Sequence, residues 1–152
     1  MHRSHRLLVS LALVAGFALS ASPVAAATTV SYQLTGSASA SLFPQVSMSG
    51  TAKAATRKES GTWSAVFGQD LGAITGGTFT LKSKARSASL AITGGTFGPA
   101  TGTCARTTIP VHGVLAGGGS FDVTLTRTGS LVNGSCAVSS STVAGSASVV
   151  YP

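Results

Sequence analysis

Acidic side chains are nearly absent from this chain. Glu59, Asp70 and Asp122 are the only three, against ten Lys and Arg residues. No two of them show the spacing that singles out the paired carboxylates of a glycosidase. Histidine is as scarce, since His112 is the only one beyond the first 27 residues, and the chain has two cysteines. A structural zinc site needs four such ligands, so we expect neither a metal site nor a cofactor.

Long apolar runs are also lacking, with one exception at the N-terminus. Arg3 and Arg6 precede the apolar residues 7–19, and small residues follow up to Ala27. This order is typical of a cleaved export signal of the bacterial type, with cleavage after Ala26 or Ala27. The apolar stretch is shorter than the ~20 residues of a membrane-spanning helix. A retained anchor is the weaker alternative.

Residues 1–27 are therefore predicted to be a signal peptide, and residues 28–152 one secreted domain, extracellular or periplasmic, without a transmembrane span after cleavage. Removing the signal lowers the formal charge from +7 to +5. Cys104 and Cys136 are the only cysteines, and an exported chain meets conditions in which disulfides persist. One bridge between them is predicted, worth about 3–4 kcal/mol in the chain-entropy model.

Apolar and polar side chains alternate through nearly all of the secreted part. The clearest segments are residues 30–34, 46–53, 63–67, 78–82, 87–93, 121–126 and 143–151. Strict alternation is typical of antiparallel strands with one buried face. Glycine-rich residues 94–95, 116–119 and 133–134 predict turns. The predicted fold class is all-β: a single-domain antiparallel meander that forms a small closed barrel, with a two-sheet β-sandwich as the alternative.

Two short segments occur twice. The seven letters AITGGTF stand at residues 73–79 and again at 91–97. The glycine pair in each copy predicts a bulge or a sharp bend, and a ligand site built from glycine backbone is the alternative. The letters GSAS stand at residues 36–39 and 145–148, near the two ends of the secreted domain. This second repeat suggests that the first and last strands are neighbours that close the sheet.

One pair of side chains carries the candidate chemistry. If Gly113 pairs with Phe121, so that both apolar faces enter one core, His112 lies opposite Asp122 on the outer face. A carboxylate so placed orients the imidazole, and the pair forms two thirds of a nucleophilic triad with a serine such as Ser120. The competing interpretation is a surface ion pair worth at most ~1 kcal/mol. No oxyanion hole is evident, so His112 and Asp122 are catalytic candidates only.

Basic residues cluster around two of the predicted turns. The six side chains are Lys53, Arg57, Lys58, Lys82, Lys84 and Arg86. If both turns emerge at one end of the barrel, they form a cationic rim suited to an anionic cell-wall polymer or an anionic lipid surface. Solubilised hairpin tips are the competing interpretation. Aromatic residues do not alternate with these cations, which disfavours nucleic acid as the partner.

The sequence thus favours a secreted, non-catalytic binding or surface-associated module with a basic rim. An extracellular hydrolase that uses the His112–Asp122 pair is one alternative. A secreted inhibitor or a structural surface component is another. The three differ in a way that experiments can separate, because only the hydrolase needs His112 and only rim binding should weaken as salt rises.

Overall fold

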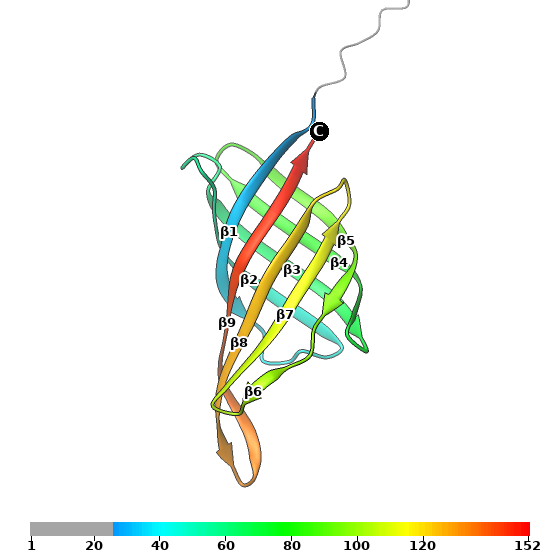
Figure 1. Cartoon of the computed structure of the whole chain (residues 1–152). Helices are drawn as coiled ribbons and strands as arrows, with labels where there is room; N and C mark the ends of the chain where they lie inside the picture. The colour runs from blue at the N-terminus through cyan, green and yellow to red at the C-terminus, as the bar shows by residue number, and fades with distance from the viewer. Residues whose placement is uncertain (1–25) are drawn as a thin grey trace, which may run out of the picture.

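The computed structural model describes residues 26–152, and this part of the chain is almost entirely β-strand (Figure 1). The strands are β1 (Thr28–Ala38), β2 (Gln45–Lys53), β3 (Gly61–Asp70), β4 (Ala73–Ser83), β5 (Ser87–Phe97), β6 (Thr101–Thr103), β7 (Arg106–Leu115), β8 (Ser120–Val132) and β9 (Ser135–Tyr151). No helix that could cross a membrane occurs among the described residues. The predicted signal peptide, up to residue 25, lies outside them, so its cleavage stays a prediction.

The strands form an antiparallel meander that closes on itself. The sheet order is β5-β4-β3-β2-β1-β9-β8-β7-β6, and an additional pairing of β5 with β7 joins the two sides into an 8-stranded barrel. The short strand β6 pairs only with β7 and lies outside the closed wall. The predicted closed barrel is confirmed over the sandwich. The first and last strands, β1 and β9, are paired neighbours, as the GSAS repeat suggested.

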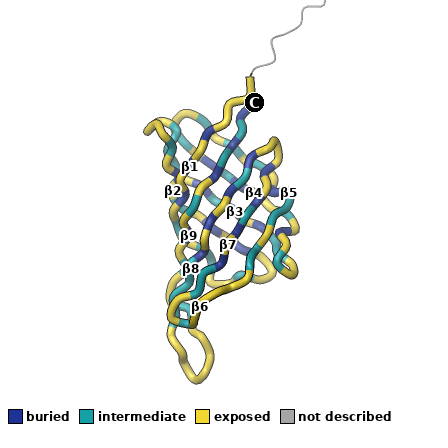
Figure 2. Tube along the Cα trace, viewed as in Figure 1, coloured by how far each residue is buried: buried dark blue, intermediate teal, exposed yellow. Residues whose placement is uncertain are grey.

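Buried and exposed residues alternate along the strands of the closed wall (Figure 2), and the buried side chains fill the barrel. The largest fully buried side chains are Tyr32, Phe67, Phe79, Phe121, Leu34, Met48, Leu81, Leu115, Leu125, Val46 and Val149. Phe121 is central, with ring centroids 5.6 Å from Phe79 and 6.2 Å from Phe67. No polar or charged residue of the described chain is buried. The interior is therefore an apolar core, and any binding chemistry lies on the outside.

The repeated AITGGTF segments form two equivalent irregularities in neighbouring strands. In β4 the register with β3 shifts and leaves Thr75 without a partner, and in β5 the register with β7 shifts and leaves Thr93 without one. Positive φ angles of 140° and 141°, which residues with a Cβ rarely adopt, occur at Gly76, the first glycine of its pair, and at Gly95, the second of its pair. The predicted bulges are confirmed. The prediction of a turn at residues 94–95 is wrong, because the bulge lets β5 continue through both glycines.

The chain between β1 and β2 closes the end of the barrel at which β1 finishes. The Gln69 side chain donates a hydrogen bond to the Leu42 carbonyl at 2.9 Å, and the Arg127 guanidinium donates one to the Ala40 carbonyl at 2.6 Å. Leu42 itself packs against the core. This connection is thus held at both sides, by β3 and by β8, and shields the core from solvent.

Strands β8 and β9 continue beyond the barrel as a projecting hairpin (Figure 1). Pairing of β9 with β1 ends at Thr142, and pairing of β8 with β7 ends at Arg127, whereas β8 and β9 stay paired up to Val132. The predicted disulfide is confirmed: Cys104, in the turn after β6, is bonded to Cys136 of the hairpin, with their Cα atoms 5.6 Å apart. The bridge therefore fastens the hairpin to the β6–β7 turn.

Candidate functional site

The two basic connections lie side by side at one end of the barrel. Because strands alternate in direction along a meander, residues 54–60 after β2 and residues 84–86 after β4 emerge at the same end. The amide of Ala85 donates a hydrogen bond to the Lys58 carbonyl at 3.0 Å, which joins the two connections directly. Both ends of the described chain lie at this same end (Figure 1). The arrangement on which a cationic rim depends is therefore present.

Four of the six basic residues surround one open depression. It has a volume of about 990 Å³, and its charged lining consists of Lys53, Arg57, Lys58 and Lys84. The uncharged part of the lining consists of Thr51, Ala52, Ser60 and Gly61. Among residues 26–152, none of the four cations forms an ion pair with a carboxylate. Their charges are therefore available to an external anion.

Arg86 has a different, structural role at this end. Its guanidinium lies 2.8 Å from the Glu59 carboxylate and 4.6 Å from the centre of the Tyr151 ring. Tyr151 in turn shares a hydrogen bond of 2.9 Å with the Tyr32 hydroxyl. Burial, together with this hydrogen bond, raises the pKa of Tyr32 far above its ordinary value, so the hydroxyl stays neutral at physiological pH. Arg86 thus ties the connection between β4 and β5 to its neighbours.

The sixth predicted residue, Lys82, stands apart from the depression. It lies on β4 opposite Thr62, on the outer wall of the barrel beside Trp63. Glu59 is the only acid in the two basic connections, and Arg86 already compensates its charge. The depression therefore keeps an uncompensated positive charge. Neighbouring like charges in a recess reinforce their attraction for anions, an effect that salt screens.

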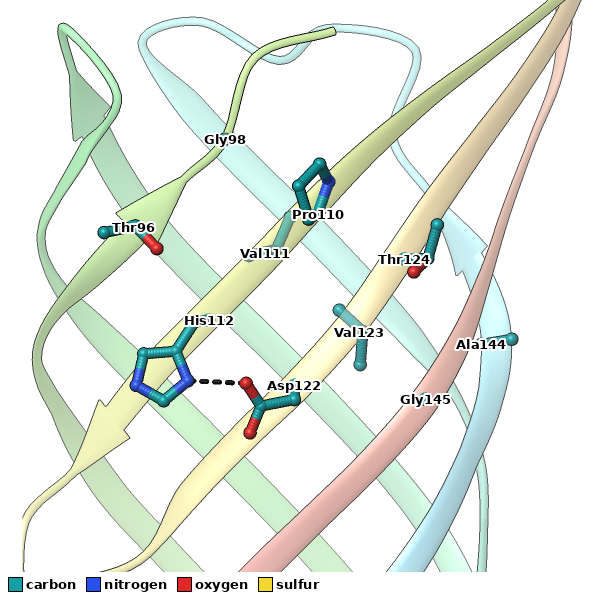
Figure 3. Close-up of a pocket in the computed structure, with 10 residues that line it drawn as sticks. All are labelled: Thr96, Gly98, Pro110, Val111, His112, Asp122, Val123, Thr124, Ala144 and Gly145. Atoms are coloured by element: carbon teal, nitrogen blue, oxygen red, sulfur yellow. Dashed lines mark hydrogen bonds and ion pairs between the residues drawn. The ribbon is translucent and has the colours of Figure 1, made fainter. Parts of the chain in front are cut away.

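His112 and Asp122 meet on the outer wall, in the register derived from the sequence. Gly113 pairs with Phe121, and His112 Nδ1 lies 2.6 Å from Asp122 Oδ1 (Figure 3). Both side chains are exposed and line a depression of about 250 Å³ with Thr96 and Pro110, among others. No hydroxyl of the described residues is hydrogen-bonded to the imidazole. The pair therefore has the orienting contact of a triad without a nucleophile engaged.

One residue of this end had no predicted role at the rim. Tyr151 ends the alternating segment 143–151 and is buried, as the alternation predicts, and the Arg86 guanidinium lies over its ring. Its place follows from the pairing of β9 with β1, which brings it opposite Thr28. Comparison of the chain with protein-family models, with curated proteins and with solved structures gives no match. The site is therefore interpreted from its own geometry and chemistry.

Proposed function

We propose that the protein is an exported, non-catalytic binding module whose cationic depression holds an anionic polymer of the cell envelope. The observation that carries this proposal is the gathering of Lys53, Arg57, Lys58 and Lys84 around one recess without a carboxylate partner. Chains rich in phosphate or carboxylate groups suit such a site, because several lysines and an arginine contact successive charges. The disulfide and the absence of a spanning helix among the described residues are compatible with a place outside the cytoplasm.

The open shape of the site suits a flexible polymer. The cations lie on β2 and on two hairpin connections around one depression, so a flexible chain can contact several of them in succession. The recess is also wide open, which suits a linear polymer better than a small anion that needs to be enclosed.

Reversing one charge in the recess should weaken binding of a polyanion. We expect Arg57→Glu to raise the Kd for long-chain inorganic polyphosphate about tenfold at low salt, because a repulsive carboxylate replaces an attractive cation. The matched control is Arg106→Glu at the opposite end, which changes the net charge by the same amount. Fluorescence anisotropy of labelled polyphosphate measures both, and poly-L-glutamate in parallel separates phosphate from carboxylate recognition.

Two results would contradict the proposal. Equal weakening by Arg57→Glu and Arg106→Glu would mean that net charge alone governs the affinity. An affinity that did not fall between about 0.05 and 0.5 M salt would exclude attraction between the rim and the polymer's charges.

The second candidate function rests on the His112–Asp122 contact at 2.6 Å. An extracellular hydrolase would use the imidazole, oriented through Nδ1, as a general base, with Thr96 as the hydroxyl on the neighbouring strand. Ester and peptide substrates offered to the purified protein test it. Hydrolysis that is lost in His112→Ala and retained in Lys82→Ala would establish this function and overturn the non-catalytic proposal.

A further inference from the structure

Large apolar side chains are exposed mainly at the end of the barrel opposite the rim. The exposed ones are Phe43, Val66, Leu71, Val114, Leu131 and Val132. Phe43 lies between β1 and β2, Leu71 between β3 and β4, and the pair Leu131–Val132 at the tip of the hairpin. All three places are at the end where β1 and β3 finish. Val66 and Val114 stand singly on the outer wall and are the least exposed of the set.

The tip of the hairpin presents two apolar side chains in an uncharged setting. Leu131 is 71% and Val132 is 52% exposed, and Asn133 and Gly134 follow with φ angles of 51° and 77°, those of a tight two-residue turn. No charged residue occurs after Arg127 in the sequence. The hairpin is exposed over most of its length beyond the barrel (Figure 2). Cys136 pairs with Leu131, next to this turn, and the disulfide joins it to the β6–β7 turn, so the tip itself is fastened.

Leu71 and Phe43 show the same exposure on the barrel itself. Leu71 is 100% exposed, with a φ of 46°, a left-handed conformation that strains a leucine and that Asn or Gly adopts more easily. Phe43 is 68% exposed and belongs to the connection that Gln69 fixes to β3. Neither side chain contributes to the core. The left-handed conformation of Leu71 costs stability, and the two exposed apolar side chains lower solubility.

We propose that the tip of the hairpin, with Leu131 and Val132, inserts into the interfacial region of a lipid bilayer, while Phe43 and Leu71 face the headgroups behind it. The four apolar side chains project from three separate connections as tips. A protein partner would need a matching recess for each tip, whereas fluid acyl chains adapt to any arrangement. Because the hairpin beyond Arg127 carries no charged side chain, its insertion does not bury a charge in the bilayer. This site is distinct from the rim and does not depend on the proposed function.

The depth of insertion follows from the backbone and from nearby charges. The outer edges of β8 and β9 are unpaired along the hairpin, and such groups need water. Insertion therefore stops at the boundary of headgroups and acyl chains, ~5–10 Å deep. Asp70 beside Leu71 and Arg106 at the start of β7 would stay in the headgroup layer, and the Arg127 guanidinium is already bound to the Ala40 carbonyl. The rim then faces away from the membrane and stays free for a polymer.

The test is binding of the mature chain to vesicles of pure phosphatidylcholine at ~1 M NaCl, where charge attraction is screened within about 3 Å. We expect the protein to float with the vesicles, and Leu131→Ser combined with Val132→Ser to lower the partition coefficient at least about tenfold, since each loses most of its apolar transfer free energy. Val114→Ser, an exposed valine on the wall, should bind as the unchanged protein does. Thermal unfolding checks that all variants are folded.

A tryptophan reporter locates the contact. Leu131→Trp should be quenched by brominated phosphatidylcholine, and Val114→Trp should not. Absence of flotation, or flotation that the double serine variant leaves unchanged, would overturn the proposal. The proposal would also fail if sedimentation showed that the protein self-associates through the tip. In that case the double serine variant would abolish self-association, and the protein would not bind vesicles. Loss of polyphosphate binding in Arg57→Glu with vesicle binding intact would show that the two sites are independent.

Discussion

Replacing Phe121 with alanine is expected to lower the free energy of unfolding by about 3–5 kcal/mol, the cost typical of emptying a large aromatic site in a core. Phe121 is fully buried, and its ring lies between Phe67 and Phe79. Gly113 on β7 is part of the same packing, because a Cβ at that position would collide with the Phe121 ring. The walls of a closed barrel are held by hydrogen bonds around the whole circumference, so they cannot collapse to fill the space.

Urea unfolding followed by the fluorescence of Trp63 measures the loss. Val114→Ala, one residue from Gly113 on the exposed face of β7, is the control and should change the stability by less than about 1 kcal/mol. If Phe121→Ala were as mild as Val114→Ala, the interior would not be packed as described. The account of a solid barrel with all binding on its outside would then fail.

Removing the disulfide should destabilise the chain by about 3–4 kcal/mol in the chain-entropy model, since the bond closes a loop between residues 32 apart. The double variant Cys104→Ser, Cys136→Ser avoids a lone thiol. Its effect on the native state should be local, because the bond joins the β6–β7 turn to the hairpin and neither belongs to the closed wall. Amide hydrogen exchange should speed up most at residues 101–103 and 129–138, whereas β1 to β4 should stay the more protected part and change only through the loss of global stability.

Wild-type protein treated with a reductant is the matched control and should show the same pattern as the double variant. Exchange in β1 to β4 as fast as in the hairpin would contradict a local role and would mean that the barrel closes only with the bridge in place. If amide exchange in the hairpin did not change, the pairing of β8 with β9 would suffice to hold the hairpin. The membrane proposal assumes that the disulfide fastens the tip, and that assumption would lose its basis.

The alternation of side chains predicts the barrel because burial of one face is a local property of each strand. The same property fixed the pairing of His112 with Asp122, since a shift by one residue would move Phe121 out of the core. The hairpin beyond the barrel could not be predicted in this way. Residues 128–141 are mostly Ser, Thr and Gly and bury neither face, so their sequence carries no period to detect.

The sequence predicts which basic residues gather at the turns, but it does not show that the two turns form one surface. Spacing places Lys53, Arg57 and Lys58 at one turn and Lys84 at another, yet only the hydrogen bond from Ala85 to Lys58 shows that the two turns touch. Arg86 was grouped with them by charge alone. Its engagement with Glu59 and Tyr151 depends on strands far apart in sequence, which composition and local pattern do not report.

The most direct test of binding at the rim is an NMR titration of the ¹⁵N-labelled mature protein with inorganic polyphosphate. We predict amide shifts concentrated in residues 53–61 and 83–87, with Leu71 and Asn133 at the far end unmoved. The opposite result, shifts centred on His112 and Asp122 or spread evenly over both ends, would show that the recess is not where the anion binds.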